Sequence, residues 1–160
     1  MDDQQNDLLE IVQKAIDLFR ENDGYLIEND LSERCICARF AICLTTALEN
    51  TSYSSYSVDV EYNRGMDGNE RSLKRIDEKP ITVDLIVHKR GYDCHYGFDN
   101  LICIEMKKST NPIGCEHDEE RLRKMTDNSY GFCYKLGVML LIDMDANNIF
   151  IHSTWKGNLD

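Results

Sequence analysis

Two apolar stretches decide the fold: ITVDLIV at residues 81–87 and LICIEMK at residues 101–107, joined by a turn-rich segment. Both runs are typical of buried strands, and their short separation predicts an antiparallel pair. Each run nevertheless contains an acid, Asp84 in the first and Glu105 in the second, and Lys107 follows two residues after Glu105. Because a buried carboxylate is costly unless something compensates its charge, these three side chains are candidates for a functional site.

The hydrophobic periodicity around these strands predicts the order α-α-β-β-β-α-β-β. Helices are expected over Leu8–Arg20 (with Gly24 as its C-cap), Leu31–Leu48 and Glu116–Lys124 (with a continuation to Tyr134 left open), and strands over Tyr56–Asn63, Ile81–His88, Leu101–Lys107, Leu136–Met144 and Asn148–His152. The polar residues 64–80 predict a loop. This order predicts a mixed β-sheet flanked by helices, an α/β fold.

Length and composition predict one domain over residues 1–160, because no linker divides the 160-residue chain. The formal net charge of -11 argues against tight, non-specific binding of nucleic acid by the chain alone. No apolar run has membrane-spanning length and the first residues lack signal-peptide features, so we expect a cytoplasmic protein without membrane contact. The seven scattered cysteines predict reduced thiols, and the Cys35/Cys37 spacing does not indicate zinc.

The two acids and the lysine have the chemistry of a divalent-metal site. Strand alternation places Glu105 and Lys107 on one face, and Asp84 can reach that face from the neighbouring strand. Two converging carboxylates can hold Mg²⁺, which takes oxygen ligands and keeps several waters. A water acidified by the metal is a nucleophile for phosphodiesters. Lys107 could orient or deprotonate that water or stabilise developing charge, and the sequence does not choose between these roles.

The residues Asp84 and Glu105-Met106-Lys107 resemble the motif of the PD-(D/E)xK nuclease superfamily, with Val83 where a proline usually precedes the first acid. A more specific resemblance is to a bacterial group within that superfamily. It is carried, in order, by Val58–Arg64, Val83–Gly91, Asn100-Leu101 with Ile104–Ser109, and Asp118 with Arg121-Leu122. The resemblance covers roughly residues 30–145, with residues 1–29 as an N-terminal helical extension.

The resemblance implies a restriction-endonuclease-like fold with the core order α-β-β-β-α-β, plus an extra N-terminal helix and C-terminal strand. It implies a nuclease that needs Mg²⁺ or Mn²⁺ and hydrolyses phosphodiester bonds of nucleic acid, DNA in preference to RNA. Asp84, Glu105 and the backbone carbonyl of Met106 would bind the metal, Lys107 would be catalytic, and Glu33 would be an auxiliary acid. A homodimer or a partner protein is compatible with this function.

Several assignments stay open. Glu33 can equally form a capping box with Asp30, Glu61 and Asn63 can face the site or solvent, and Asp118 can be a helix N-terminal charge. Phosphate contacts are expected, if at all, from Lys74, Arg75, Lys79, Lys89 and Arg90. The histidines and tyrosines are interpreted as surface, rim or core residues. Two rival functions remain: a non-cleaving regulatory or partner-binding module of a nucleic-acid defence or repair assembly, and a structural protein with a buried Asp84–Glu105–Lys107 ion-pair network.

Overall fold

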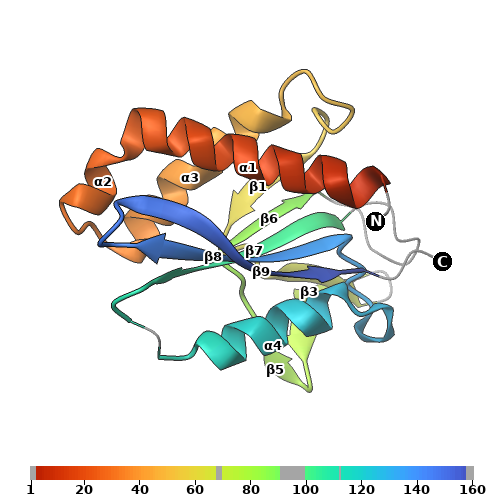
Figure 1. The fold of residues 1–160 in the computed structure, drawn as a ribbon. Coiled ribbons are helices and arrows are strands. Elements are labelled where there is room, and N and C mark those ends of the chain that lie inside the picture. The colour runs from red at the N-terminus through yellow and green to blue at the C-terminus, as the bar shows by residue number, and fades with distance from the viewer. Residues whose placement is uncertain (1–2, 68–69, 91–99, 112, 158–160) are drawn as a thin grey trace.

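A mixed five-stranded sheet is the centre of the computed structural model, which describes residues 3–67, 70–90, 100–111 and 113–157. The strand order is β1-β6-β7-β8-β9 (Figure 1). These strands are β1 (Ser57–Val60), β6 (Leu85–His88), β7 (Asn100–Lys108), β8 (Leu136–Asp143) and β9 (Asn148–Lys156). As the sequence predicts, β6 and β7 are antiparallel. Only β7 and β8 run parallel among these neighbours, which gives the mixed sheet.

Helices cover both faces of this sheet (Figure 1). On one face lie α1 (Asp3–Asp23), the short α2 (Tyr25–Glu28) and α3 (Glu33–Leu48); on the other lie α4 (Cys115–Thr126) and the 3₁₀ turn η2 (Asn128–Tyr130). Along β7, Ile102 and Ile104 pack into the α1/α3 core, whereas Cys103 packs toward α4. Glu105 and Lys107 therefore share the α4 face, which confirms the alternation expected from the sequence.

Helix α1 is an amphipathic helix longer than the predicted Leu8–Arg20. Its buried stripe includes Leu8, Val12 and Phe19, and Phe19 packs against Phe40 of α3 with ring centroids 6.2 Å apart. Gly24 directly follows the last residue of α1, the place predicted for a C-cap, and its φ of -52° is right-handed because α2 begins at the next residue. A Cβ at Gly24 would lie 2.9 Å from the Arg20 carbonyl oxygen, so close backbone approach explains the glycine.

The N-terminus of α3 differs from the prediction, because Ser32 and not Asp30 is the N-cap. Ser32 has the extended backbone of an N-cap, and its hydroxyl oxygen accepts a hydrogen bond from the Cys35 backbone N–H at 3.2 Å. Asp30 lies outside the helix with a φ of 53°. The capping box of Asp30 with Glu33 is therefore wrong, and Glu33 becomes the first residue of the helix.

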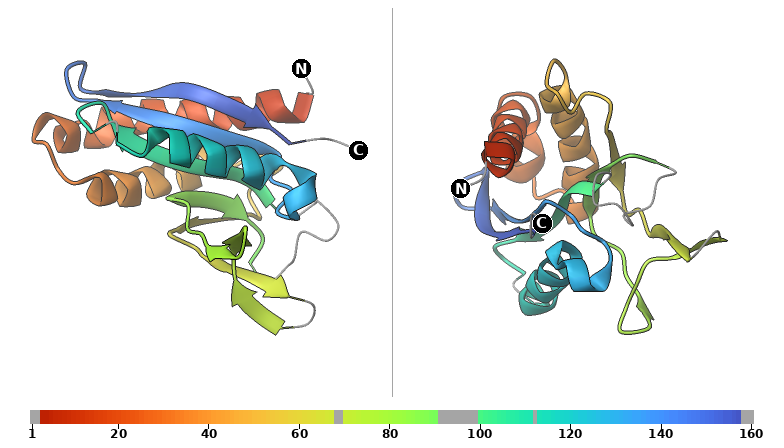
Figure 2. Two further views of the ribbon diagram at one scale, coloured as in Figure 1. Left: turned by 90° about the horizontal axis from the view of Figure 1, so that it is seen from below. Right: turned by 90° about the vertical axis from the view of Figure 1, so that its right-hand side faces the viewer.

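The predicted loop over residues 64–80 is instead two small hairpins. They are formed by β2 (Arg64–Asp67) with β3 (Glu70–Leu73), and by β4 (Arg75–Ile76) with β5 (Lys79–Pro80). Both views in Figure 2 show them projecting from the body of the fold. Asp77 and Glu78 make the second turn with φ values of 50° and 65°, as in a type I′ hairpin. Because neither residue is the glycine or asparagine usual in such turns, the sequence does not show this hairpin.

The first two predicted strands are too long, whereas β7 extends one residue beyond each end of its predicted range. The first leaves the sheet at Glu61, whose φ is 50°, and the Glu61 backbone N–H donates to the Asp84 carbonyl at 3.0 Å. Asp84 consequently lies just before β6 rather than in the middle of a strand. The turn predicted between β6 and β7, with His95, falls on residues 91–99, outside the described residues.

The remaining boundaries change less. Helix α4 ends at Thr126, so the continuation to Tyr134 that the sequence left open does not form, and β9 extends beyond the predicted His152 to Lys156. The six cysteines in the described part of the chain are free thiols. Within the described ranges, every helix is too short or too polar to traverse a lipid bilayer.

A polar cluster of Asp59, His88 and Arg90 links β1 to β6 and to the residues that follow it. The His88 ring lies 2.8 Å from one carboxylate oxygen of Asp59. The Asp59 carboxylate also accepts two hydrogen bonds from Arg90, one at each oxygen. Burial lowers the pKa of His88 below its ordinary 6.5; the Asp59 hydrogen bond raises it, and the charges of Lys74 and Arg90 lower it further. Tyr62 packs against the imidazole, with ring centroids 4.5 Å apart.

We expect this buried histidine to make the fold less stable in mild acid. Because the unfolded chain binds the proton more readily, the stabilisation is present above pH 6.5 and is lost as the pH falls through the lower folded-state pKa of His88. Nuclear magnetic resonance should show His88 titrating below 6.5. The loss of unfolding free energy between neutral pH and about pH 5 should be smaller in His88→Gln than in the unmodified protein. A His88 pKa above 6.5 would contradict this account.

Candidate active site

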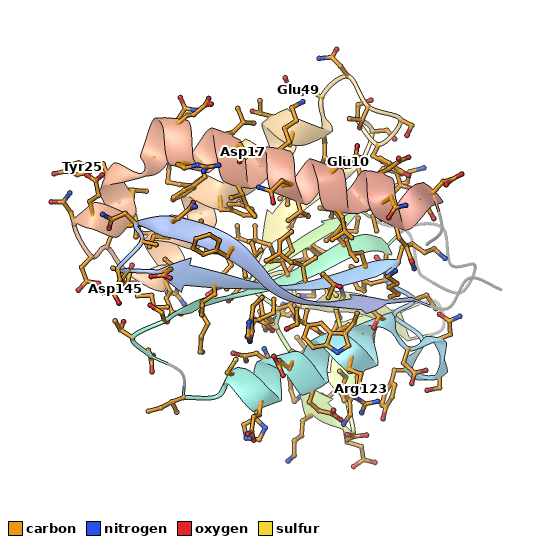
Figure 3. The ribbon with its side chains drawn as sticks, in the orientation of Figure 1. Glu10, Asp17, Tyr25, Glu49, Arg123 and Asp145 are labelled. Carbon is orange, nitrogen blue, oxygen red and sulfur yellow. The ribbon has the colours of Figure 1, made fainter. Side chains whose placement is uncertain are left out.

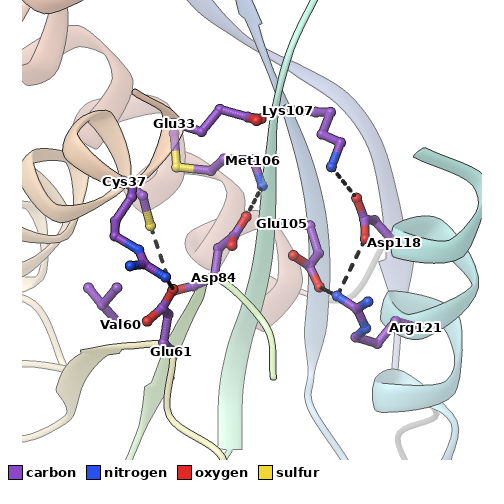
Figure 4. A pocket seen from close by; sticks show the side chains of 11 residues that line it. Glu33, Cys37, Val60, Glu61, Asp84, Glu105, Met106, Lys107, Asp118 and Arg121 are labelled. Atoms are coloured by element: carbon purple, nitrogen blue, oxygen red, sulfur yellow. Dashed lines mark hydrogen bonds and ion pairs between the residues drawn. The ribbon is translucent and has the colours of Figure 1, made fainter. Parts of the chain in front are cut away.

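A pocket of about 250 Å³ lies between the start of α3, the strands β6 and β7, and α4. Its lining residues are Glu33, Arg34, Cys37, Val60, Glu61, Asp84, Glu105, Met106, Lys107, Asp118 and Arg121 (Figure 4). Five of these side chains carry carboxyl groups and three are basic, so acids outnumber bases in the pocket. It contains all four residues expected to act in catalysis, together with Met106.

Asp84 reaches the pocket from the segment just before β6. One of its carboxylate oxygens accepts a hydrogen bond from the Met106 backbone N–H at 2.8 Å, which fixes the side chain against β7. Burial raises the pKa of Asp84; the hydrogen bonds from Met106 and from the Glu105 carboxyl lower it, and the charges of Asp118 and Glu33 raise it. The net effect is a raised pKa, so the pocket destabilises the ionised form of this acid.

Glu105 is the most deeply placed acid of the site, with 3% of the residue exposed. Burial raises its pKa well above the ordinary value, the neighbouring Asp84 charge raises it further, and Arg121 opposes both effects. Glu105 is paired with the Arg121 guanidinium (Figure 4). The buried Glu105 carboxyl and the neighbouring, half-buried Asp84 carboxyl therefore compete for positive charge and protons.

Lys107 leaves β7 on the same face as Glu105 and is held by α4. Its ammonium lies 3.2 Å from a carboxylate oxygen of Asp118, and about four-fifths of the side chain is covered, with 20% exposed. Burial alone would lower the pKa of Lys107, but the hydrogen bond and charge of Asp118 and the charges of Glu33 and Asp84 raise it above its ordinary value. Lys107 is therefore a fixed cation at the edge of the pocket.

Glu33 points from the first turn of α3 toward β7 (Figure 4). Its carboxylate accepts a hydrogen bond from the Lys108 backbone N–H at 3.0 Å. This contact joins two segments 75 residues apart and places the acid in the pocket. Of the two interpretations left open by the sequence, the structure excludes the capping box, and it places the Glu33 side chain among the residues that line the pocket.

Glu61 also lines the pocket, where it pairs with Arg34 at 2.8 Å. The pair lies at the rim, with 78% of the Arg34 side chain and 48% of the Glu61 side chain exposed. Exposed ion pairs of this kind contribute little to stability. Asn63 does not line the pocket. Its backbone carbonyl accepts a hydrogen bond from the Lys74 backbone N–H, beside the projecting hairpins.

The residues expected to contact phosphate are mostly engaged elsewhere. Lys74 is buried and donates to the Tyr134 hydroxyl at 2.7 Å, so its expected role in a solvated loop is wrong. Arg90 pairs with Asp59, and the Lys89 ammonium lies over the Tyr56 ring. None of the five residues in this set lines the pocket: Lys74, Arg75, Lys79, Lys89, Arg90. Four of the five pair with nearby groups, which explains their positions better than a phosphate-binding surface does: Lys74, Arg75, Lys89 and Arg90.

Helix α4 brings Asp118 and Arg121, the residues of the last segment of the resemblance, to the pocket. Asp118 and Arg121, three residues apart on one helix face, contact Lys107 and Glu105 respectively. The resemblance singled out both residues, but helical spacing does not identify a partner on a distant strand, so neither contact was predicted. The sequence did not indicate that Cys37 would line the pocket. Its thiol donates to the Asp84 carbonyl at 3.7 Å. Burial raises the pKa of this thiol, so Cys37 is an unreactive residue of the pocket lining.

The donor set of this pocket fits a divalent cation held by two carboxylates. Within the ranges that the structure describes, no three His, Cys, Asp or Glu side chains form a ready-made metal cluster. Asp84 and Glu105 nevertheless supply adjacent carboxylate oxygens, which Mg²⁺ and Mn²⁺ prefer as ligands. A cation here would offset the burial and mutual repulsion that raise both pKa values. The residues fit a metal that keeps several waters and do not fit a closed protein cage.

Comparison of the chain with protein-family models, with curated proteins and with solved structures found no match.

Proposed function

We propose that this protein is a metal-dependent nuclease that hydrolyses phosphodiester bonds, with DNA as the preferred substrate. The observation that carries the proposal is the pairing of the buried Glu105 carboxyl with the neighbouring, half-buried Asp84 carboxyl, beside the Lys107 ammonium in one pocket. Buried acids with raised pKa values are unfavourable in a purely structural role. They are common where a cation or a reacting group completes the site.

The order of elements supports a restriction-endonuclease-like fold. The series α3, β1, β6, β7, α4, β8 follows the core order α-β-β-β-α-β of the superfamily that the sequence resembles. Helix α1 and strand β9 then correspond to the additional N-terminal helix and C-terminal strand. The two hairpins β2–β3 and β4–β5 are an insertion between the first and second core strands.

In the proposed reaction, the residues of the pocket have three roles: metal binding, stabilisation of charge on the phosphate, and support of the pocket wall. Asp84 and Glu105 hold the cation, and the Met106 backbone N–H fixes Asp84 in place. When bound, the cation acidifies a water and supplies positive charge to phosphate oxygens. Lys107, oriented by Asp118, holds its ammonium where it can position the attacking water or stabilise charge on the phosphate. Glu33 ties the start of α3 to β7 and thereby keeps the pocket wall in position.

The ion pairs in the pocket do not satisfy all of its acids. Five carboxyl groups share three basic side chains, and one of those bases, Arg34, lies at the exposed rim. A divalent cation would supply the positive charge that these bases do not, and it would favour the ionised forms of Asp84 and Glu105, whose pKa values burial raises. The excess of acid therefore supports a site for a cation over a structural network.

A second candidate is a non-cleaving, partner-binding module that keeps the fold and binds metal. The formal net charge of -11 favours it, because a nuclease acting alone must approach a polyanion. A basic partner protein would then supply the nucleic-acid contacts. Turnover separates this candidate from the nuclease, whereas both require the cation site.

Calorimetric titration with MgCl₂ and MnCl₂ tests the cation site without reference to a substrate. The unmodified protein should bind, and Asp84→Asn should lose most of the binding, because one of the two carboxylate ligands becomes neutral. Asp17→Asn is a matched control, since Asp17 is a half-exposed acid of α1 that pairs with Arg20. Absence of binding by a folded, unmodified protein would refute the proposed function and leave the ion-pair network.

A further inference from the structure

Within the described part of the chain, the hydrogen bonds and ion pairs of the Arg121 guanidinium, on α4, all involve one of its three nitrogens. Nη1 is paired with Glu105, lies 3.4 Å from a carboxylate oxygen of Asp118, and donates to the Thr82 carbonyl at 3.2 Å. Among the described residues, neither Nε nor Nη2 has a protein partner. A guanidinium has five donor hydrogens in a planar fork, so the side chain keeps a free edge that matches phosphate geometry.

The Arg121 guanidinium is the positively charged group that pairs with Glu105. The Arg121 side chain is 27% exposed and reaches in from the pocket wall, whereas Glu105 is almost fully buried and cannot turn to solvent. In the metal-free protein, the guanidinium therefore occupies one side of a carboxylate that a divalent cation would also need (Figure 4). Two cations that share one carboxylate repel each other, so their occupancies are coupled.

Asp118 gives the arginine a second anchor. Its two carboxylate oxygens face different bases, one Lys107 and the other Arg121. When Arg121 leaves Glu105, Asp118 can retain the guanidinium at the pocket wall, on the same side as Lys107. From there the free edge of the guanidinium can donate hydrogen bonds to two oxygens of a phosphate group.

We infer that Arg121 holds the place of the divalent cation at Glu105 and is released by that cation to bind the phosphate of the substrate. The inference rests on the proposed function and adds to it an order of events, because Arg121 can turn its free edge to the phosphate only after the cation has taken its place at Glu105. It also explains how a pocket rich in carboxylates admits a polyanion. Before the exchange, the guanidinium charge is paired with Glu105. After it, the charges of the cation and of the released guanidinium can both act on the phosphate.

Titration of Mn²⁺ into four proteins tests the exchange without any measurement of cleavage: the unmodified protein, Arg121→Gln, Arg121→Lys and Arg123→Gln. Arg123 is the matched control, because it lies on the same helix and pairs with Glu120, about half exposed (Figure 3). Loss of the competing charge should tighten Mn²⁺ binding by Arg121→Gln about five- to tenfold. Arg121→Lys, which keeps a charge, and Arg123→Gln should bind as the unmodified protein does.

The second half of the inference is tested by fluorescence anisotropy with a labelled DNA duplex and saturating Mn²⁺, in a Lys107→Met background to suppress cleavage. Arg121→Gln should weaken DNA binding about tenfold, the loss expected for a charge-assisted, two-point phosphate contact. Arg123→Gln should not weaken it. A fall that is equal in both variants would indicate a general effect of surface charge and would overturn the assignment.

A measurement on the unmodified sequence removes any dependence on how the variants fold. The Nε–H resonance of Arg121 should shift when diamagnetic Mg²⁺ is added, because the guanidinium leaves Glu105. An unshifted resonance in a protein that binds Mg²⁺, or unchanged Mn²⁺ affinity in Arg121→Gln, would overturn the inference and leave the proposed function intact. Failure of the unmodified protein to bind either metal would instead defeat the proposed function, and the inference with it.

Discussion

Replacing Asp84 with asparagine should abolish metal-dependent cleavage and, at the same time, make the metal-free protein more stable. The loss of one of two carboxylate ligands should lower the cleavage rate on the order of a thousandfold, since metal charge contributes several kcal/mol to such reactions. The asparagine oxygen can still accept the hydrogen bond from the Met106 backbone N–H. Substitution therefore removes the charge while it leaves the geometry of β7 in place.

The gain in stability follows from what Asp84 costs the metal-free fold. Burial and the charges of Asp118 and Glu33 raise the pKa of Asp84, which shows that its ionised form is unfavourable there. Neutral asparagine should increase the unfolding free energy by about 1 kcal/mol, measured by urea unfolding with a chelator present. Asp17→Asn on α1 should change neither stability nor cleavage appreciably. An Asp84→Asn protein that cleaves at the unmodified rate would remove Asp84 from the site.

Replacing Lys107 with methionine should lower the cleavage rate by roughly a hundred- to a thousandfold, the range observed when one stabilising donor is removed from an active site. Methionine keeps the apolar stem of the lysine and removes only the ammonium, so packing beside β7 is preserved. Because Lys107 is not a metal ligand in this account, Mg²⁺ affinity should change only a few-fold. The decisive comparison is single-turnover cleavage at saturating metal.

Lys124→Met is the matched control for this substitution. Lys124 resembles Lys107 in exposure, at 17% against 20%, and its ammonium also pairs with an aspartate, Asp77. It lies outside the pocket. Lys124→Met should therefore cleave at nearly the unmodified rate. An equal loss of activity in both variants would show that the effect of Lys107→Met arises from general stability or charge and not from the site.

The carboxylates of the site were predictable because their setting is local in the sequence. Asp84 and Glu105 each lie in or beside an apolar run, and period-two alternation places Glu105 and Lys107 on one face. The helical and strand segments followed from the same hydrophobic periodicity. Glu33 was predictable as a site candidate from its place on the apolar stripe of its helix, although its cap assignment was wrong because Ser32 also carries a capping side chain.

What the sequence could not provide depends on contacts between distant segments or on unusual backbone angles. The pairing of Glu105 with Arg121 joins a strand to a later helix, and nothing in the spacing of either element specifies it. The turn at Asp77 and Glu78 needs two positive φ values from residues that rarely adopt them. Lys74 reads as a solvated loop residue, and only the folded arrangement shows it buried against Tyr134.

The most direct measurement of the central claim is cleavage of a panel of single- and double-stranded DNA and RNA by the unmodified protein and by Lys107→Met, with Mg²⁺, Mn²⁺ or a chelator. We expect cutting that requires Mg²⁺ or Mn²⁺, is strongest on DNA, and is lost in Lys107→Met. Cutting that persists in the chelator or in Lys107→Met would contradict the assigned site. No cutting of any substrate by a folded, metal-binding protein would contradict the nuclease and favour the partner-dependent module.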